Sequence, residues 1–394
     1  SNLIHHFASD ELKNLYLPLM RSGRAAGTMA LTEPDTGSSL ADIKTYATPA
    51  EQGHYLVKGN KMYISGGDQD ITDNIVHLVL AKIKGAPAGV KGISLFLVPK
   101  WLVDDNGDPA QRNDVQLAGL LHKMGYRGTT STVLNFGEQD NCVGYLIGEP
   151  HQGLKYMFMM MNEARVGVGL GAAVIGYRGY AESLEYARQR PQGRHPSNKD
   201  PASKPIPIIE HADVKRMLLA QKSYTEGAIA LCLYANHLID RIETCADEDQ
   251  RKPLQELLDL LTPIVKSWPS EFGPKANSLA IQILGGAGYI REYPVEQLYR
   301  DNRLNPIHEG THGIQAMDLL GRKLWQSNGL GLQTLLREIQ ATLQQAAEFP
   351  DLAPYSEQLQ EALLLVNATT QSVGEQLQQQ GPDMAWPMRL PFSA

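Results

Sequence analysis

The run of side chains best suited to chemistry in this sequence is Ile307-His308-Glu309-Gly310-Thr311, where a carboxylate is followed by a glycine. Removal of a proton next to a carbonyl group needs a base within reach and hydrogen-bond donors aimed at the oxygen that gains charge. A helix beginning after Glu309 would present such donors as exposed backbone N–H groups. The same run is also typical of a carboxylate that only complements a helix dipole, and the local sequence alone favours that simpler interpretation.

Two further motifs place hydroxyl groups and glycine where a strand is predicted to end. The first runs from Met29 to Ser38 and could present backbone N–H groups to a phosphate or a polar heterocycle. In the second, Tyr63 and Ser65 alternate onto one strand face, which suits a flat cofactor. An Asx-type turn explains the first motif more simply, and an ordinary β surface explains the second equally well.

A pair of glycines, Gly285 and Gly286, closes a predicted helix after Gln282. Glycine commonly ends a helix in the left-handed conformation, and it also lets a backbone approach a ligand closely. The 11 histidines lack the carboxylate or cysteine partners of a metal site, so we predict no metal. No phosphate-binding glycine loop and no nucleophile elbow is found, which weakens the NTPase, dinucleotide-binding and hydrolase classes.

The composition is that of a soluble globular protein. The chain has 394 residues, a formal net charge of -7, 42% hydrophobic and 20% charged residues. An acidic chain has no general attraction to nucleic acid or anionic lipid, and no apolar run approaches the roughly 20 residues of a membrane span. Three cysteines without paired spacing indicate a reducing compartment. We therefore predict a cytoplasmic protein without a nucleic-acid partner or a membrane span.

Short β-branched runs separated by turn residues predict strands between residues 27 and 150. The predicted strands are Thr45–Ala47, Tyr55–Lys58, Met62–Ser65, Ile75–Ile83, Ile93–Val98 and Thr130–Phe136, with Gly59-Asn60 among the turns. Because helical crossovers are absent from this stretch, we expect the strands to form an antiparallel, barrel-like sheet.

Helical periodicity replaces the strands after Pro150. Long helices are predicted over residues 154–188, 211–242 and 253–284, the last with an interruption at Pro263 and a break between Pro269 and Pro274. A heptad stripe from Leu359 to Leu377 faces a second stripe from residue 332 to 343, which predicts a helical hairpin. The expected fold is α+β, with a β domain followed by a helical bundle and an appended hairpin.

Taken in order, six motifs resemble the acyl-CoA dehydrogenase family. They are Thr32-Glu33-Pro34 with Gly37-Ser38, then 61–65, 190–194, 282–289, Tyr299-Arg300-Asp301 and Glu309-Gly310-Thr311. The longer loops at 104–113 and 194–207 and the helical tail are similar to a larger bacterial subgroup, which includes methylmercaptopropionyl-CoA and long fatty acyl-CoA dehydrogenases. The resemblance implies four parts: a remnant of an N-terminal helical domain (1–26), a middle β domain (27–150), a helical bundle (151–328) and the appendage (329–394).

The resemblance also implies an activity: FAD-dependent α,β-dehydrogenation of an acyl-CoA, with Glu309 abstracting the α-proton and flavin N5 accepting the β-hydride. It implies cofactor contacts for Met29, Leu31, Thr32, Gly37, Ser38, Tyr63, Ser65, Arg190, Gln282, Gly285, Gly286 and Thr311, and substrate contacts for Ser38, Arg165 and Gly310. Arg190 would reach the FAD of a neighbouring subunit in a homodimer or a dimer of dimers. Electrons would pass to an electron-transfer flavoprotein. An acyl-CoA oxidase and a non-catalytic protein that binds DNA or a partner remain alternatives.

Overall fold

The fold is described from a computed structural model, which covers residues 1–380 apart from residues 52 and 199. By its internal contacts the chain divides into two units. Unit 1 comprises Ser1–Cys232 and Val265–Ile314, and unit 2 comprises Leu233–Ile264 together with the chain from Gln315 onward. The helices α4 (Ala212–Thr244) and α5 (Glu248–Leu284) contribute to both units. The four-part division inferred from the sequence stays a prediction.

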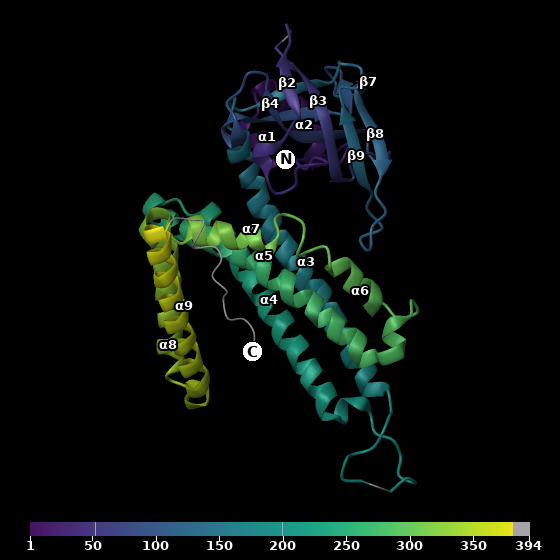
Figure 1. Ribbon diagram of the computed structural model, residues 1–394, viewed down its shortest axis with the longest axis vertical. Coiled ribbons are helices and arrows are strands. Elements are labelled where there is room, and N and C mark those ends of the chain that lie inside the picture. The colour runs from purple at the N-terminus through teal and green to yellow at the C-terminus, as the bar shows by residue number, and fades with distance from the viewer. Residues whose placement is uncertain (52, 199, 381–394) are drawn as a thin grey trace. The chain divides into compact units, whose positions relative to one another are not determined.

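Unit 1 begins with two helices, α1 (Asn2–Phe7) and α2 (Asp10–Arg21), which are followed by the strands. One sheet has the order β1-β4-β5-β10-β3-β9-β8, with β2 paired to both β3 and β4. Figure 1 labels β2, β3, β4, β8 and β9 of this sheet. Its strands are β1 (Ala25–Ala30), β2 (Tyr46–Pro49), β3 (Tyr55–Ser65), β4 (Asn74–Ile83), β5 (Ile93–Pro99), β8 (Val115–Leu120), β9 (Ser131–Phe136) and β10 (Val143–Ile147). A separate two-stranded sheet joins β6 (Trp101–Val103) and β7 (Pro109–Arg112).

The sheet is mixed, so the prediction of an antiparallel sheet is wrong. β4 pairs in parallel with β1 and with β2. A parallel pair needs a crossover connection, and the sequence offers no helix for it. The connection from β1 to β4 instead passes through the β2–β3 hairpin, which serves as the crossover. The barrel-like shape is not confirmed.

β3 is one continuous strand, so the predicted turn at Gly59-Asn60 is also wrong. Gly59 and Asn60 pair with Phe136 and Asn135 of β9. A Cβ on Gly59 would lie 2.3 Å from the Oγ1 of Thr45, so the glycine permits close packing instead of making a turn.

The core of unit 1 lies on both faces of β4 and β5. On one face Leu80 and Leu95 pack with residues of α1 and α2, and on the other face Val79 and Phe96 form a second cluster. All four side chains have 0% exposure. Burial on both faces explains why these two strands are almost uninterrupted apolar runs in the sequence.

Two long helices, α3 (Gly153–Gln189) and α5, run parallel to each other in unit 1. α3 begins against β5 and runs beside α5 (Figure 1). Glycines of α3 face α5 in register. A Cβ on Gly169 would lie 2.1 Å from the carbonyl oxygen of Val265, one on Gly176 would lie 3.0 Å from Gly273, and one on Gly179 would lie 2.5 Å from Asn277. The two backbones therefore pack closer than side chains would allow. We call this line of contact between α3 and α5, at Gly169, Gly176 and Gly179, the glycine seam.

α5 continues unbroken through Pro263, Pro269 and Pro274, so the predicted interruption and break are wrong. Each proline removes a helical hydrogen bond and disfavours a helix interior. The apolar face of α5 remains buried across these positions, from Leu260 to Ala280, and tertiary packing outweighs the local preference.

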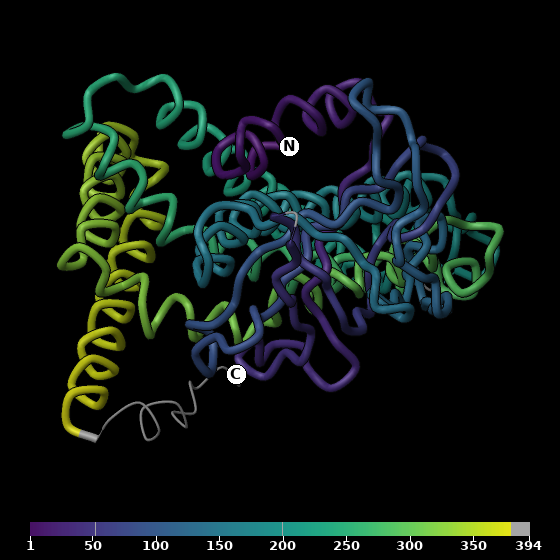
Figure 2. Tube along the Cα trace, turned by 90° about the horizontal axis from the view of Figure 1, so that it is seen from above, coloured from purple at the N-terminus to yellow at the C-terminus, as the bar shows by residue number. Residues whose placement is uncertain are grey.

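Unit 2 contains the helical hairpin that the heptad stripes predict. α8 (Leu330–Ala346) and α9 (Ala353–Gln380) lie side by side in both views (Figures 1 and 2). The stripe on α9 is only partly covered, because Val373 is 7% exposed and Val366 is 52% exposed. An ion pair of 3.1 Å between Lys323 and Asp259 stabilises the same unit.

α3 is long and apolar enough to cross a membrane by length and composition, with a mean hydropathy of 1.2 in its most apolar window. A core helix of a soluble protein passes the same test. In unit 1, α3 packs on β5 and α5, and 33% of that window is buried.

The glycine seam leads to a stability prediction. Gly169→Ala should lower the free energy of unfolding by about 1–3 kcal/mol, because the new methyl group would meet the Val265 carbonyl. Gly167→Ala is the matched control on the same helix, since nothing stands within 4 Å of its Cβ position. Urea unfolding measures both variants. Equal stability of the two variants would show that the helices do not pack as described.

Candidate active site

Glu309 lies in a turn between α6 (Val295–Asn302) and α7 (His312–Asp318). The turn has an unusual backbone, with φ of +53° at Glu309 and +92° at Gly310. A non-glycine residue in the left-handed region stores strain on the order of 1–3 kcal/mol, which the surrounding structure must offset. Hydrogen bonds between the start of this turn and the neighbouring helices offset that strain.

Buried asparagines fasten this turn to the two long helices. The amide of Asn302 donates to the Ala172 carbonyl of α3 at 3.0 Å and to the Oδ1 of Asn277 of α5 at 2.7 Å. Asn305 donates in turn to the Oδ1 of Asn302 at 2.8 Å. All three asparagines are buried, and so the start of the turn is held at the α3–α5 seam.

Glu309 is largely buried, and its surroundings act on its charge in opposite directions. Burial raises the pKa of the Glu309 carboxyl above its ordinary value of 4.5, and the positive charges of Arg165 and Lys266 oppose that shift. Burial and the Lys266 charge lower the pKa of His308 to about 4, which leaves that imidazole neutral near pH 7. The result is a carboxylate with raised proton affinity, flanked by cations from α3 and α5.

The β domain brings the other predicted motifs together at the end of β1. The N–H of Met62 donates to the carbonyl of Thr32 at 2.9 Å, so β3 lies directly beside the turn that begins there. Glu33 and Thr36 close that turn with two backbone hydrogen bonds of 2.9 and 3.1 Å. Gly37 and Ser38 then stand exposed beyond the turn.

A buried ion pair holds this turn against β3. The Nζ of Lys61 donates to Glu33 Oε1 and to the Leu31 carbonyl, both at 2.9 Å. Burial alone raises the pKa of Glu33, but the Lys61 charge and hydrogen bonds from Thr45 and Lys44 hold it below its ordinary value. Burial lowers the pKa of Lys61 to about 8, although Glu33 opposes the shift.

Tyr63 and Ser65 both point outward from β3, as the alternation predicts, with Ile64 buried between them. The Tyr63 side chain is 64% exposed and its backbone has a φ of +60°, at a register shift between Lys61 and Ile64. An exposed ring on a bulge beside a hydroxyl is a surface that a planar ligand can cover.

The remaining predicted residues lie at the other end of the long helices. Arg190 ends α3, which places it about 37 Å along the helix from Arg165 at 1.5 Å per residue. Gln282 lies in the last turn of α5 and Gly285 and Gly286 directly follow the helix, and a cluster containing Ala187 and Ile283 joins the two helix ends. Gly285 has a φ of +60°, so the helix-ending interpretation accounts for it. Within one chain, these residues form a second group far from Glu309.

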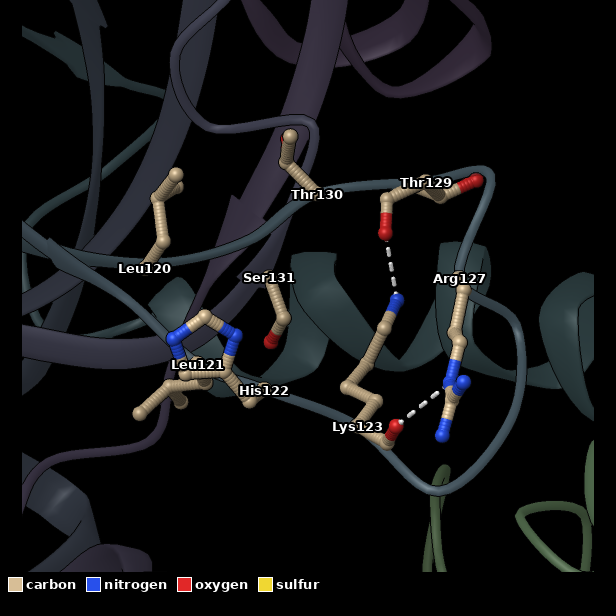
Figure 3. A pocket seen from close by; sticks show the side chains of 8 residues that line it. All are labelled: Leu120, Leu121, His122, Lys123, Arg127, Thr129, Thr130 and Ser131. Atoms are coloured by element: carbon tan, nitrogen blue, oxygen red, sulfur yellow. Dashed lines mark hydrogen bonds between the residues drawn. The ribbon is translucent and has the colours of Figure 1, made fainter.

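The loop between β8 and β9 is a candidate that sequence reasoning missed. Residues 120–123, Arg127 and 129–131 line a cavity of about 400 Å³ (Figure 3). Arg300 donates to the Met124 carbonyl, and the N–H of Tyr126 donates to Asp301, both at 2.7 Å, which fastens the loop to α6. The sequence feature that could have indicated this site is the pair Lys123 and Arg127 close to the hydroxyl residues 129–131. Cations and hydroxyl groups together suit the binding of an anion.

Within residues 1–380, leaving out 52 and 199, no group of three His, Cys, Asp or Glu side chains is arranged to hold a metal ion.

The sequence model of the acyl-CoA dehydrogenase middle domain matches residues 28–138, and that of the C-terminal domain matches residues 151–324. An acyl-CoA dehydrogenase of Bacillus subtilis is 30% identical over 319 residues, which is 80% of this chain and 73% of that protein. This chain belongs to the acyl-CoA dehydrogenase family, whose members are FAD-dependent.

The 3-methylmercaptopropionyl-CoA dehydrogenase of Ruegeria pomeroyi is 43% identical over 334 residues, which is 85% of this chain and 56% of that protein. A solved acyl-CoA dehydrogenase of Bacillus anthracis, complexed with FAD, matches with a TM-score of 0.69 and 27% identity, over 87% of this chain and 55% of that one. This chain therefore spans just over half the length of both.

The ion pair beneath the Thr32 turn gives a prediction. Lys61→Met should lower the free energy of unfolding by about 3–5 kcal/mol, because it leaves the Glu33 carboxylate buried without its cation. Adding Glu33→Gln should restore part of the loss. Lys58→Met is the control, because Lys58 lies on the same strand in an exposed ion pair and should change stability little. An unaltered unfolding midpoint in Lys61→Met would contradict the pair.

Proposed function

We propose that the protein is an FAD-dependent acyl-CoA dehydrogenase in which Glu309 abstracts the α-proton of an acyl-CoA thioester. The observation that carries this proposal is the largely buried Glu309 carboxylate, which lies in a strained turn, has its pKa raised by burial and is acted on by the charges of Arg165 and Lys266. A general base works best when its pKa lies near the working pH, and burial moves a carboxyl in that direction. Membership of the family supports the same activity.

The residues around Glu309 have distinct tasks in this mechanism. Arg165 and Lys266 favour the ionised carboxylate that accepts the proton, and the neutral His308 adds no further charge. The N–H of Glu309 is proposed to donate to the thioester oxygen as negative charge develops there. Ser38, Arg165 and Gly310 are proposed to contact the substrate.

The residues of the chain fit a flavin. Gly37 and Gly286 have no positive φ, and no described atom lies within 4 Å of either Cβ position, so the chain itself does not demand glycine there. Bare backbone at these points and the exposed Tyr63 ring suit a ligand with a flat ring and phosphates. FAD, when bound, supplies the acceptor for the β-hydride. Met29, Leu31, Thr32, Ser65 and Thr311 complete the proposed group near the ring.

The separation of the two groups of cofactor residues supports a homodimer or a dimer of dimers. Arg190 and the Gln282–Gly286 stretch stand at the far end of α3 and α5 from Glu309. Residues so far apart serve one cofactor most simply when a neighbouring subunit supplies the distant group. We accordingly propose that Arg190, Gln282, Gly285 and Gly286 contact the FAD of the neighbour.

Coenzyme A carries phosphates, and the cationic cavity at Lys123 and Arg127 is one place on this chain that suits them. An electron-transfer flavoprotein is the proposed electron acceptor. The cytoplasm is the proposed compartment, in agreement with three free cysteines. Nothing in the described residues favours the oxidase or the DNA-binding alternative.

Replacement of the base tests the mechanism directly. Glu309→Gln keeps the shape of the side chain but cannot accept a proton, and we expect turnover to fall by about 10²- to 10⁴-fold while the flavin content is unchanged. The measurement is anaerobic bleaching of bound flavin by acyl-CoA. Glu185→Gln, an exposed change on α3, is the control. Wild-type turnover in Glu309→Gln would place the base elsewhere.

The pH dependence of turnover tests the charge of the same group. A protonated Glu309 cannot accept a proton, so the rate should fall as the pH decreases, with a midpoint above the ordinary carboxyl value of 4.5. The measurement is kcat/KM against pH from 4 upward, over the range in which the protein stays folded. A rate that stays constant down to pH 4.5 would contradict the raised pKa.

A further inference from the structure

Lys266 is a fully buried cation whose ammonium group has no hydrogen-bond partner among the described residues. It lies on α5 directly after Val265, at the glycine seam with α3, and its exposure is 0%. Taking an ammonium group out of water without a partner is costly, so such a group is retained only where other interactions offset the cost.

Two other lysines are buried in the described chain, and each has a carboxylate. Lys61 binds Glu33 at 2.9 Å, and Lys323 lies 3.1 Å from Asp259. A lysine held only for packing would extend its charged end to solvent along its apolar stem. Lys266 neither pairs with a carboxylate within hydrogen-bond distance nor extends its ammonium to solvent, which sets it apart from a structural lysine.

Lys266 is coupled electrostatically to groups of three neighbouring elements: Glu309 and Arg165 act on its pKa, and its own charge lowers the pKa of His308 and His312. Glu309 and His308 belong to the turn before α7, His312 begins α7, and Arg165 comes from α3. Glu309 is the carboxylate of this set, because Glu271 of α5 is engaged by His312, whose Nε2 lies 3.1 Å from its Oε2. The Lys266 ammonium is therefore balanced by the proposed base.

We propose that Lys266 is a positioning residue for Glu309, whose ammonium keeps the carboxylate ionised. This inference rests on the proposed function of Glu309. Among the described residues the ammonium has no hydrogen-bonded acceptor, and its charge acts on the carboxylate of Glu309 as well as on His308 and His312. Burial lowers the pKa of Lys266 to about 8, with Glu309 opposing the shift, so the ammonium remains charged at neutral pH.

The test compares Lys266→Met with Lys266→Arg, because methionine removes the charge and arginine keeps it. The first readout needs no turnover: infrared titration of the Glu309 carboxyl without substrate, with Glu309→Gln as the difference reference. We expect its protonation midpoint to rise by about 1–3 pH units in Lys266→Met, since the nearby cation is lost, and to stay close to wild type in Lys266→Arg.

The second readout is kinetic. The acid limb of kcat should move to higher pH in Lys266→Met by the same amount, with KM for acyl-CoA and flavin content unchanged. Lys222→Met removes an exposed lysine on α4 and should leave the profile unaltered. A merely structural lysine would lower kcat equally at every pH.

An unchanged carboxyl midpoint in folded Lys266→Met would overturn the inference, and Lys266→Gln serves if the methionine variant does not fold. Failure of the proposed function looks different: Glu309→Gln would keep its turnover while the infrared coupling between Lys266 and Glu309 persisted.

Discussion

A largely buried carboxylate under the influence of two cations is the constraint on which the proposed site depends. Burial alone would leave Glu309 protonated too readily to serve as a base, and the charges of Arg165 and Lys266 alone would make it too weak a base. The two effects come from the same packing arrangement, because Arg165 belongs to α3 and Lys266 to α5, the two helices to which the turn of Glu309 is fastened. The electrostatics of the site therefore follow from how α3 and α5 pack.

That packing depends on small residues. Gly169, Gly176 and Gly179 let the backbone of α3 approach α5, and Asn302 spans the resulting seam with hydrogen bonds to both helices. A second rigid point lies in the β domain, where Lys61 and Glu33 hold the Thr32 turn beside β3. Both positions use buried polar groups with defined partners, which restrict geometry more than apolar contacts do.

Much of the secondary structure was predictable, since the helices predicted over 154–188 and 211–242 and the predicted hairpin correspond to α3, α4 and the pair α8 and α9. Local rules failed where distant segments decide the outcome. β3 continues across Gly59, where a turn was predicted, because the glycine leaves room for Thr45 to pack against the strand. α5 continues across Pro263, Pro269 and Pro274 because its apolar face is buried. The parallel pairing of β4 was missed because a hairpin, not a helix, provides the crossover.

The order of short motifs in the sequence determined the family and singled out Glu309, since the six motifs follow one another along this chain in the order typical of the family. Local spacing could not show that the charge of Lys266 acts on the proposed base, because a lone lysine in a helix carries no motif. It also could not show that Arg190 stands far from Glu309 in the same chain. Such relations depend on which helix faces meet, and only the tertiary structure decides that, because burial and charge coupling act between residues far apart in the sequence.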